Sequence, residues 1–117
     1  MAARFNIKIF TESADMSLVE IAVKQLAIDD LEINLSYPKN YDVKQNELAI
    51  VGINSLEDNI LSKILDAGNN TENKTIIVTE SQDIVLASTL ARFGFNEIYV
   101  FPQELQKLKA SLLEVVE

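Results

Sequence analysis

The chain has 117 residues, of which 48% are hydrophobic and 24% are charged, values close to the averages for globular domains. It contains no cysteine and no histidine, which excludes a disulfide framework, thiol catalysis, thiolate metal sites and the commonest general base. Ten basic against 18 acidic residues give a net charge of −8, so we do not expect this domain alone to bind nucleic acid.

The length predicts a single domain that spans residues 1–117. The apolar stretches are too short to cross a bilayer, and the first residues lack the pattern of an export signal. We therefore expect a cytoplasmic protein that does not act at a membrane.

The first part of the chain alternates strand-like and helix-like patterns. Residues 4–10 place apolar side chains in period two and predict the first strand. Apolar residues then recur every three or four positions over 16–27, which predicts a helix that Ser13 or Ser17 could cap. Residues 31–37 alternate again and predict a second strand.

The middle of the chain begins with a stretch that lacks clear periodicity. Residues 38–47 hold a proline and two asparagines, so any helix there is expected to be short or missing. Residues 48–54, LAIVGIN, predict a third strand, which is buried. A helix follows, opened by Ser55 and Asp58 in a capping-box pattern. Its predicted apolar stripe consists of Leu56, Ile60, Leu61, Ile64 and Leu65.

The second half continues this alternation. Residues 75–79, TIIVT, are nearly all β-branched and predict a strand that is covered on both faces. A helix is expected over about 81–93, with Gly94 at its end. Residues 97–101 predict a fifth strand, after which Pro102 is expected to start the last helix. The inward side of the 81–93 helix is predicted to consist of Ile84, Ala87, Leu90 and Ala91.

Strands that alternate with helices imply parallel βαβ units with right-handed crossovers. The whole pattern therefore predicts an α/β domain built on one small, doubly wound parallel sheet of five strands, with helices on both faces.

The layout of the second half resembles that of bacterial response-regulator receiver domains. The resemblance rests on a strand that ends in Thr79, a helix closed by the residues FGF, a strand with an aromatic residue, and then Pro102. The spacing from Thr79 to Pro102 also fits that family, and the similarity of layout covers essentially the whole chain. It implies a flavodoxin-like (CheY-like) sheet with the strand order 2-1-3-4-5.

Most of the residues that receivers use for phosphorylation are replaced in this chain. The resemblance implies a phosphoacceptor aspartate at the end of the third strand, where this sequence has Gly52. Thr11 and Glu12 stand where two acidic metal ligands are expected, and Phe101 stands in place of a lysine. Only Thr79 matches the pattern. Glycine and phenylalanine supply neither a nucleophile nor a cation, so we expect no phosphoryl transfer, no metal and no cofactor.

The resemblance therefore implies an atypical receiver that acts as a regulatory module without phosphorylation, although another flavodoxin-like domain remains an alternative. Receivers commonly dock partners, or a second copy, through the face formed by the fourth helix, the fifth strand and the fifth helix. In this chain that face would contain Ser88, Arg92, Ile98, Tyr99, Gln106 and Lys109.

Receivers that have lost the aspartate also occur ahead of other domains. They precede MinD/ParA-type ATPases in pilus-assembly systems, where they serve localisation and dimerisation, and they precede transcriptional activator ATPases. The resemblance thus implies the N-terminal domain of such a protein, with a protein partner or a homodimer as its complex. A free-standing adaptor is the alternative within the same class.

An enzyme is the weaker hypothesis. Glu12, Asp15 and Glu80 lie at or just past strand ends, so their carboxylates could converge and support a metal-assisted hydrolase using Glu12 and Glu80. Acidic residues near helix N-termini are also explained by the helix dipole. The turn after the first strand contains no glycine, which disfavours nucleotide or flavin binding. Tyr37 and Tyr41 offer a second candidate surface, although packing within a loop would also explain them.

Overall fold

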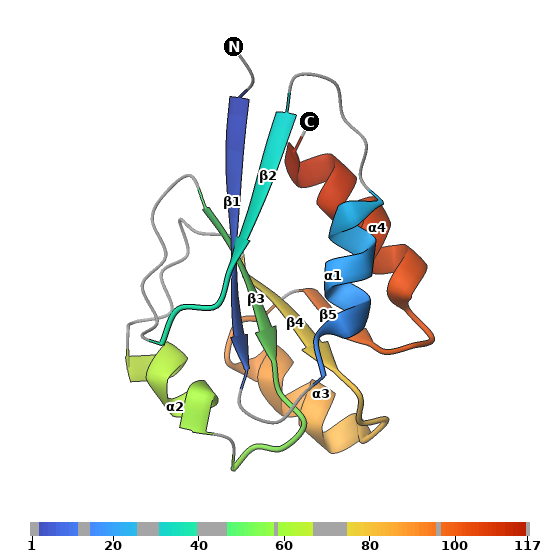
Figure 1. The fold of residues 1–117 in the computed structure, drawn as a ribbon. Helices are drawn as coiled ribbons and strands as arrows, with labels where there is room; N and C mark the ends of the chain where they lie inside the picture. Colours follow the sequence, from blue (N-terminus) through green and yellow to red (C-terminus); the bar gives the residue numbers. More distant parts are fainter. Residues whose placement is uncertain are drawn as a thin grey trace.

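The computed structural model describes residues 3–11, 15–25, 31–39, 47–57, 59–66, 75–95 and 97–116. These residues form a five-stranded parallel sheet in the order β2-β1-β3-β4-β5 (Figure 1), which confirms the predicted flavodoxin-like α/β topology. The strands are β1 (Ala3–Thr11), β2 (Leu31–Ser36), β3 (Glu47–Gly52), β4 (Thr75–Thr79) and β5 (Glu97–Val100). The helices are α1 (Ser17–Lys24), α2 (Asn59–Asp66), α3 (Ile84–Arg92) and α4 (Leu105–Val116).

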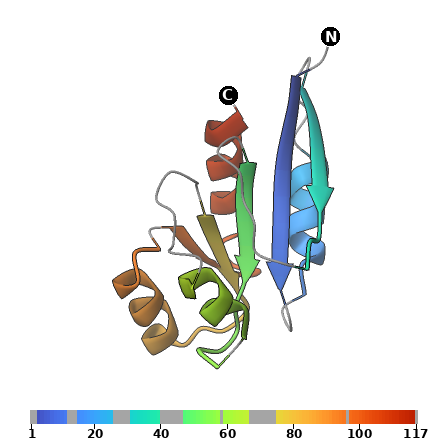
Figure 2. The same ribbon diagram turned by 90° about the vertical axis from the view of Figure 1, so that its left-hand side faces the viewer.

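One face of the sheet is covered by α1 and α4, which lie side by side (Figures 1 and 2). The alternating pattern of β1 explains this packing, because Phe5, Ile7 and Ile9 point to the same face, as predicted. We call the buried residues on this side the first cluster. Its members are Ile7, Ile9, Met16, Val19, Ala22, Val23, Leu48, Ile50, Ile76, Val78, Phe101, Leu108 and Leu112.

The opposite face is covered by α2 and α3 (Figure 2). Phe10 follows Ile9 in β1 and therefore points to this side. We call the buried residues here the second cluster. Its members are Phe10, Ala49, Val51, Ile53, Ile60, Leu61, Ile77, Leu86, Leu90 and Phe95. Both β3 and β4 contribute to both clusters, as the predicted burial of these strands requires.

The register of the sheet brings the carboxyl ends of the central strands together. Thr11 at the end of β1 pairs with Gly52 at the end of β3, and Gly52 pairs with Val78 of β4. Thr79, the last residue of β4, pairs with Val100 of β5. In open α/β sheets this edge is where ligands bind, so the residues just beyond these strand ends form the candidate site.

Two helix starts differ from the predictions. Helix α1 does begin at Ser17, but the Ser17 side chain does not cap it. Instead Asp15 Oδ1 accepts the Ser17 backbone N–H at 3.0 Å and the Ser17 hydroxyl at 2.6 Å. Helix α4 begins at Leu105 rather than Pro102, because residues 101–104 form a turn in which the N–H of Glu104 donates to the carbonyl of Val100 at 2.7 Å. The other proposed cap of α1, Ser13, lies outside the described residues.

The predicted opening of α2 is also wrong. The helix begins at Asn59, and the Ser55 hydroxyl accepts the N–H of Glu57 within the preceding turn. Leu56 precedes the helix and is 41% exposed, so it does not belong to the apolar stripe. Of that predicted stripe, Ile60 and Leu61 are buried. The side chains of Ile64 and Leu65, and the residue Asp58, lie outside the described part.

Helix α3 is rotated relative to the prediction. Asp83 caps it, with Oδ1 accepting the Val85 N–H at 2.9 Å, so the first helical residue is Ile84. The buried side chains are Leu86 and Leu90, which are one turn apart. Ile84 stands two residues before Leu86, about 200° around the helix axis, and therefore points outward. The predictions that Ile84 and Ala91 face inward are wrong, since Ile84 is 80% exposed and Ala91 is exposed.

The end of α3 explains the glycine in the FGF motif. Gly94 adopts a φ of 100°, which glycine reaches without steric cost. The N–H of Gly94 donates to the carbonyl of Ala91 at 3.1 Å, and the N–H of Phe95 donates to the carbonyl of Leu90 at 3.3 Å. This is the Schellman arrangement, and it directs the buried Phe95 into the second cluster.

Among the residues that the structure describes, no helix combines the length and the apolar character that a membrane span requires.

Candidate functional site

The end of β3 carries no side chain at the centre of the sheet. Gly52 is buried and lies between Thr11 of β1 and Val78 of β4. This is the position at which the resemblance to receivers implies a phosphoacceptor. A glycine offers no carboxylate or other nucleophile for phosphoryl transfer.

Asn54 joins the loops that follow β3 and β4. Its Oδ1 accepts the N–H of Glu80 at 2.9 Å and, over a longer 3.4 Å, the hydroxyl of Thr79. Its Nδ2 donates to Glu80 Oε1 at 3.3 Å. The Thr79 hydroxyl in turn accepts the N–H of Ser81 at 3.1 Å, and Thr79 is only 1% exposed. Thr79, the residue that matches the receiver pattern, therefore forms hydrogen bonds that stabilise the loop after β4.

Glu80 extends this network to the loop after β1. The same Oε1 that accepts from Asn54 also accepts the N–H of Asp15 at 2.8 Å. Asp15 accepts from both the hydroxyl and the backbone N–H of Ser17, and these bonds, the hydroxyl first, lower the pKa of the Asp15 carboxyl. Sequence reasoning correctly placed Asp15 and Glu80 at one edge of the sheet, while Glu12 lies outside the described residues.

Phe101 occupies the position at which receivers carry a lysine. Its N–H donates to the carbonyl of Thr79 at 2.8 Å, which continues the pairing of β4 with the chain beyond β5. Its side chain is 3% exposed and belongs to the first cluster. The space that a cation would occupy is thus part of the apolar core.

A hollow of about 270 Å³ lies between the ring of Phe101 and the hydrogen-bond network that contains Asp15 and Glu80. Its described lining contains two carboxylates, those of Asp15 and Glu80, and no basic side chain. A bound phosphoryl group would face negative charge without a neutralising cation. In the described part of the chain, moreover, there is no group of three or more acidic side chains that could hold a metal ion. Among the described residues, the arrangement crosslinks the chain segments that follow β1, β3 and β4.

The residues of the predicted interaction face lie around β5. Ser88 and Arg92 are exposed on α3, on one side of the sheet. Gln106 is exposed and Lys109 half-buried on α4, on the other side. The strand between them, β5, is at the edge of the sheet, so the predicted face spans both sides of that edge.

The two β5 residues of that face are half-buried. Ile98 packs against the second cluster and Tyr99 against the first. The Tyr99 hydroxyl donates to Glu97 Oε1 at 3.3 Å, and the Ser111 hydroxyl of α4 donates to the same oxygen at 2.7 Å. Partial burial, followed by the neighbouring Glu97 carboxylate, raises the pKa of Tyr99. Much of the contact area of Ile98 and Tyr99 is therefore used within the domain.

Sequence reasoning missed an exposed apolar pair at the start of α3. Ile84 and Val85 are 80% and 65% exposed. Ile84 lies one turn before Ser88 and two turns before Arg92, so these residues share one side of the helix. The sequence signal that could have predicted this exposure is Asp83. A helix capped at Asp83 that buries Leu86 and Leu90 must turn Ile84 outward.

One backbone N–H on the outer edge of β5 is bonded within the chain itself. The N–H of Phe101 points to β4, so the N–H of Val100 points outward, and Glu104 Oε1 accepts it at 2.8 Å. Glu104 also forms an ion pair with Lys107 at 3.0 Å. The bond from Val100, followed by that from Lys107, lowers the pKa of Glu104. This cap disfavours the addition of another strand beside β5.

Comparison with known proteins gives one informative result. No protein-family model and no curated protein sequence matches this chain. Among solved structures, the chain is similar to a protein assigned as a CpaE2 pilus assembly protein from Sinorhizobium meliloti 1021, with a TM-score of 0.64 and 20% sequence identity. The match covers 94% of this chain and 98% of that chain. At this level of identity, the likeness shows a shared fold.

Proposed function

We propose that this chain is a receiver-like regulatory module that works without phosphorylation, by binding a protein partner or a second copy of itself. The observation that carries the proposal is Gly52, a buried residue without a side chain at the strand end where phosphorylation would occur. Phe101 in the core and Glu80 in the loop network support the same conclusion. Because position 52 offers no phosphoacceptor, the proposal assigns the function to recognition by the surface.

The binding surface of this proposal is the exposed side of α3. Ile84 and Val85 expose apolar area at its first turn, and Ser88 and Arg92 continue the same region. An apolar centre beside an arginine is typical of residues that dominate protein interfaces. The capped edge of β5 favours association through this helix over association by strand addition.

Pilus assembly is the setting that we propose for this module. The similar fold of a CpaE2 pilus assembly protein supports it, as does the resemblance to receivers that precede MinD/ParA-type ATPases. In this setting the domain would localise or pair an ATPase and would itself catalyse no reaction.

Phosphorylation-independence is tested by incubating the chain with Mg²⁺ and either acetyl phosphate or beryllofluoride. We expect no covalent mass increase and no shift of the melting temperature, because position 52 holds no acceptor. A stable phosphorylated adduct on any aspartate would contradict this part of the proposal.

The surface is tested by light scattering over micromolar to millimolar concentrations. For a self-associating domain, Ile84→Glu should weaken association at least tenfold, as expected when charge is placed at the centre of an apolar contact. The matched control is Ile21→Glu, since Ile21 is 46% exposed on α1, on the opposite face. If the wild-type chain is monomeric at all these concentrations, the proposed homodimer is wrong. Pull-down of the proposed MinD/ParA-type ATPase partner with the same two variants then tests the binding surface.

A further inference from the structure

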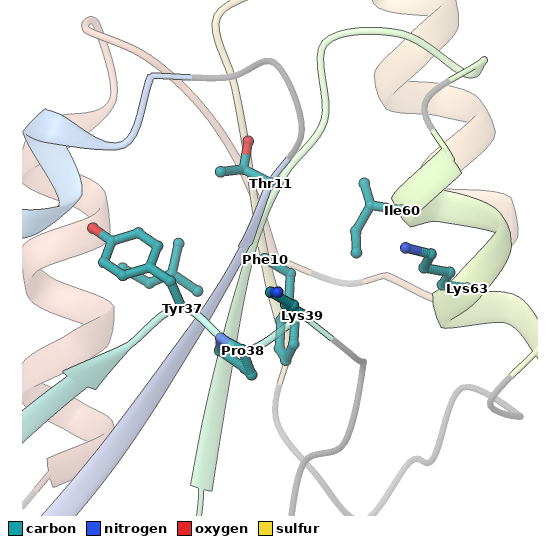
Figure 3. A pocket seen from close by; sticks show the side chains of 8 residues that line it. Phe10, Thr11, Tyr37, Pro38, Lys39, Ile60 and Lys63 are labelled. Carbon is teal, nitrogen blue, oxygen red and sulfur yellow. The ribbon is translucent and has the colours of Figure 1, made fainter.

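A pocket lies between the carboxyl ends of β1 and β2 and helix α2 (Figure 3). Residues 9–11 of β1, residues 37–39 after β2, and Ile60 and Lys63 of α2 line it. Its volume is about 390 Å³. Sites for small molecules range from about 300 to 1,000 Å³, so this pocket is large enough for a small ligand.

The floor and one wall of the pocket are apolar. Phe10 and Ile60 are 2% and 5% exposed and belong to the second cluster, so packing holds them in place. Pro38 adds a further apolar ring. The ring of Tyr37 forms part of the wall. Its hydroxyl points away from the pocket (Figure 3) and donates to the carboxylate of Glu20.

Two ammonium groups flank this apolar floor. Lys39 follows β2 and Lys63 lies in the last turn of α2, so the two cations come from opposite sides of the pocket (Figure 3). Lys63 and Ile60 are three residues apart and share the side of α2 that faces the pocket. Among the residues described, no acidic side chain lines the pocket, and no carboxylate forms an ion pair with either lysine.

The positive charge of this pocket is unusual in a chain with a negative net charge. The net charge is −8, and two neighbouring hollows have acidic linings, one with Asp15 and Glu80 and the other with Asp15 and Glu20. Two like charges beside one cavity repel each other, and a bound anion relieves that repulsion. The pocket between β1, β2 and α2 therefore differs from its surroundings in the way that an anion site requires.

We propose that this pocket binds a small amphipathic anion, in which a carboxylate or phosphate group is attached to an apolar or aromatic body. The anionic group would lie between Lys39 and Lys63, and the body would pack on Phe10, Pro38 and the ring of Tyr37. This site is independent of the proposed docking surface on α3. It would give the domain an input that requires no phosphoacceptor.

The test uses two anionic probes, phenyl phosphate and benzoate, and the neutral analogue benzyl alcohol. Binding is measured by ligand-observed NMR on the wild-type chain and on Lys39→Gln, Lys63→Gln and Lys24→Gln. Lys24 is exposed on α1 and serves as the control, because its replacement removes the same charge on the other face of the sheet. Circular dichroism verifies that each variant is folded.

We expect at least one of the anions to bind, and to bind more tightly than benzyl alcohol. Lys39→Gln and Lys63→Gln should each weaken binding about threefold to tenfold, in keeping with charge-assisted contacts at a partly exposed site, and added salt should weaken it further. Lys24→Gln should leave the affinity unchanged. Preference for phenyl phosphate or for benzoate identifies the anionic group and supports the proposal in either case.

Three outcomes would overturn the proposal. The first is that neither anion binds at millimolar concentration. The second is that benzyl alcohol binds as tightly as the anions. The third is that Lys39→Gln and Lys63→Gln bind as tightly as Lys24→Gln.

Discussion

Phe101 illustrates how a single side chain alters the chemistry of a strand end. The ring is 3% exposed and packs with residues from α1, α4 and the sheet. Phe101→Ala would leave a cavity, so we expect a loss of about 3 to 5 kcal/mol in the free energy of unfolding. Phe101→Leu keeps most of the volume and should cost less than about 1.5 kcal/mol. Urea denaturation of both variants measures the difference, and equal stabilities would show that the ring is not a core residue.

The pKa of the Tyr37 hydroxyl is strongly raised by its surroundings. Partial burial, followed by the hydrogen bond to the Glu20 carboxylate, raises the pKa of Tyr37 to about 12 from an ordinary value of 10.0. The folded pKa lies above the unfolded one, so the stabilisation is complete below pH 10.0 and is lost as the pH rises through about 12.

Absorbance of the phenolate tests this prediction. We expect the wild-type chain to show a transition near pH 12 that Tyr37→Phe removes and that Glu20→Gln moves to lower pH. Tyr99→Phe is the control, because burial first, and then the carboxylate of Glu97 rather than that of Glu20, raises the pKa of Tyr99. A Tyr37 transition that Glu20→Gln leaves in place would contradict the assigned hydrogen bond.

At the scale of an element, the start of α3 depends on one cap. Asp83 accepts the N–H of Val85 at 2.9 Å, and this bond satisfies a donor that no carbonyl of the helix can reach. Asp83→Ala should therefore lower the free energy of unfolding by about 1 kcal/mol. Gln82→Ala, an exposed neighbour outside the helix, should change it by less than about 0.5 kcal/mol. Thermal denaturation of the two variants distinguishes the cap from a general surface effect.

The connection from β5 to α4 should respond to acid. Bonds from Val100 and Lys107 lower the pKa of Glu104 below its ordinary value of 4.5. Because the folded pKa is the lower one, the stabilisation is present above pH 4.5 and is lost as the pH falls through the folded pKa. Glu104→Gln should thus be less stable than wild type near neutral pH, with a smaller difference in acid. Urea denaturation at both pH values tests this, and a constant difference would contradict it.

The sequence was most informative where a periodic pattern determines an element. The β-branched run at 75–79 predicted the limits of β4, and the alternation in β1 predicted which side Phe5, Ile7 and Ile9 occupy. Helix starts were predicted less well, because several polar residues that can cap a helix precede each start. The helix expected over about 81–93 is capped by Asp83 and begins at Ile84, which lies outside the core.

The candidate site was predicted in part for a similar reason. The position of Gly52 follows from the strand pattern alone, and the structure places it at the expected strand end. The role of Asn54 could not be predicted, because its partners Thr79 and Glu80 lie about 25 residues away in sequence. The same holds for Lys39 and Lys63, which only the packing of α2 beside β1 and β2 brings to one pocket.

At the scale of the whole molecule, the strands differ in burial from the centre of the sheet to its edges. In β3 and β4 every residue but the first is buried, whereas every residue of β5 is only half-buried. Opening the centre requires disruption of both clusters, while the edge can open locally. We expect the slowest hydrogen exchange at backbone amides of β3 and β4, and faster exchange in β5 and β2, as measured by NMR. Uniform protection across the sheet would indicate that the edges do not open separately.

The sheet also divides the interior into two compartments. The first cluster joins α1 and α4, the second joins α2 and α3, and the strands' backbones stand between them (Figure 2). Side chains in one compartment can therefore be exchanged while the packing of the other is kept. Substitutions on the α2 and α3 side can therefore change a binding surface while the packing of the first cluster is kept.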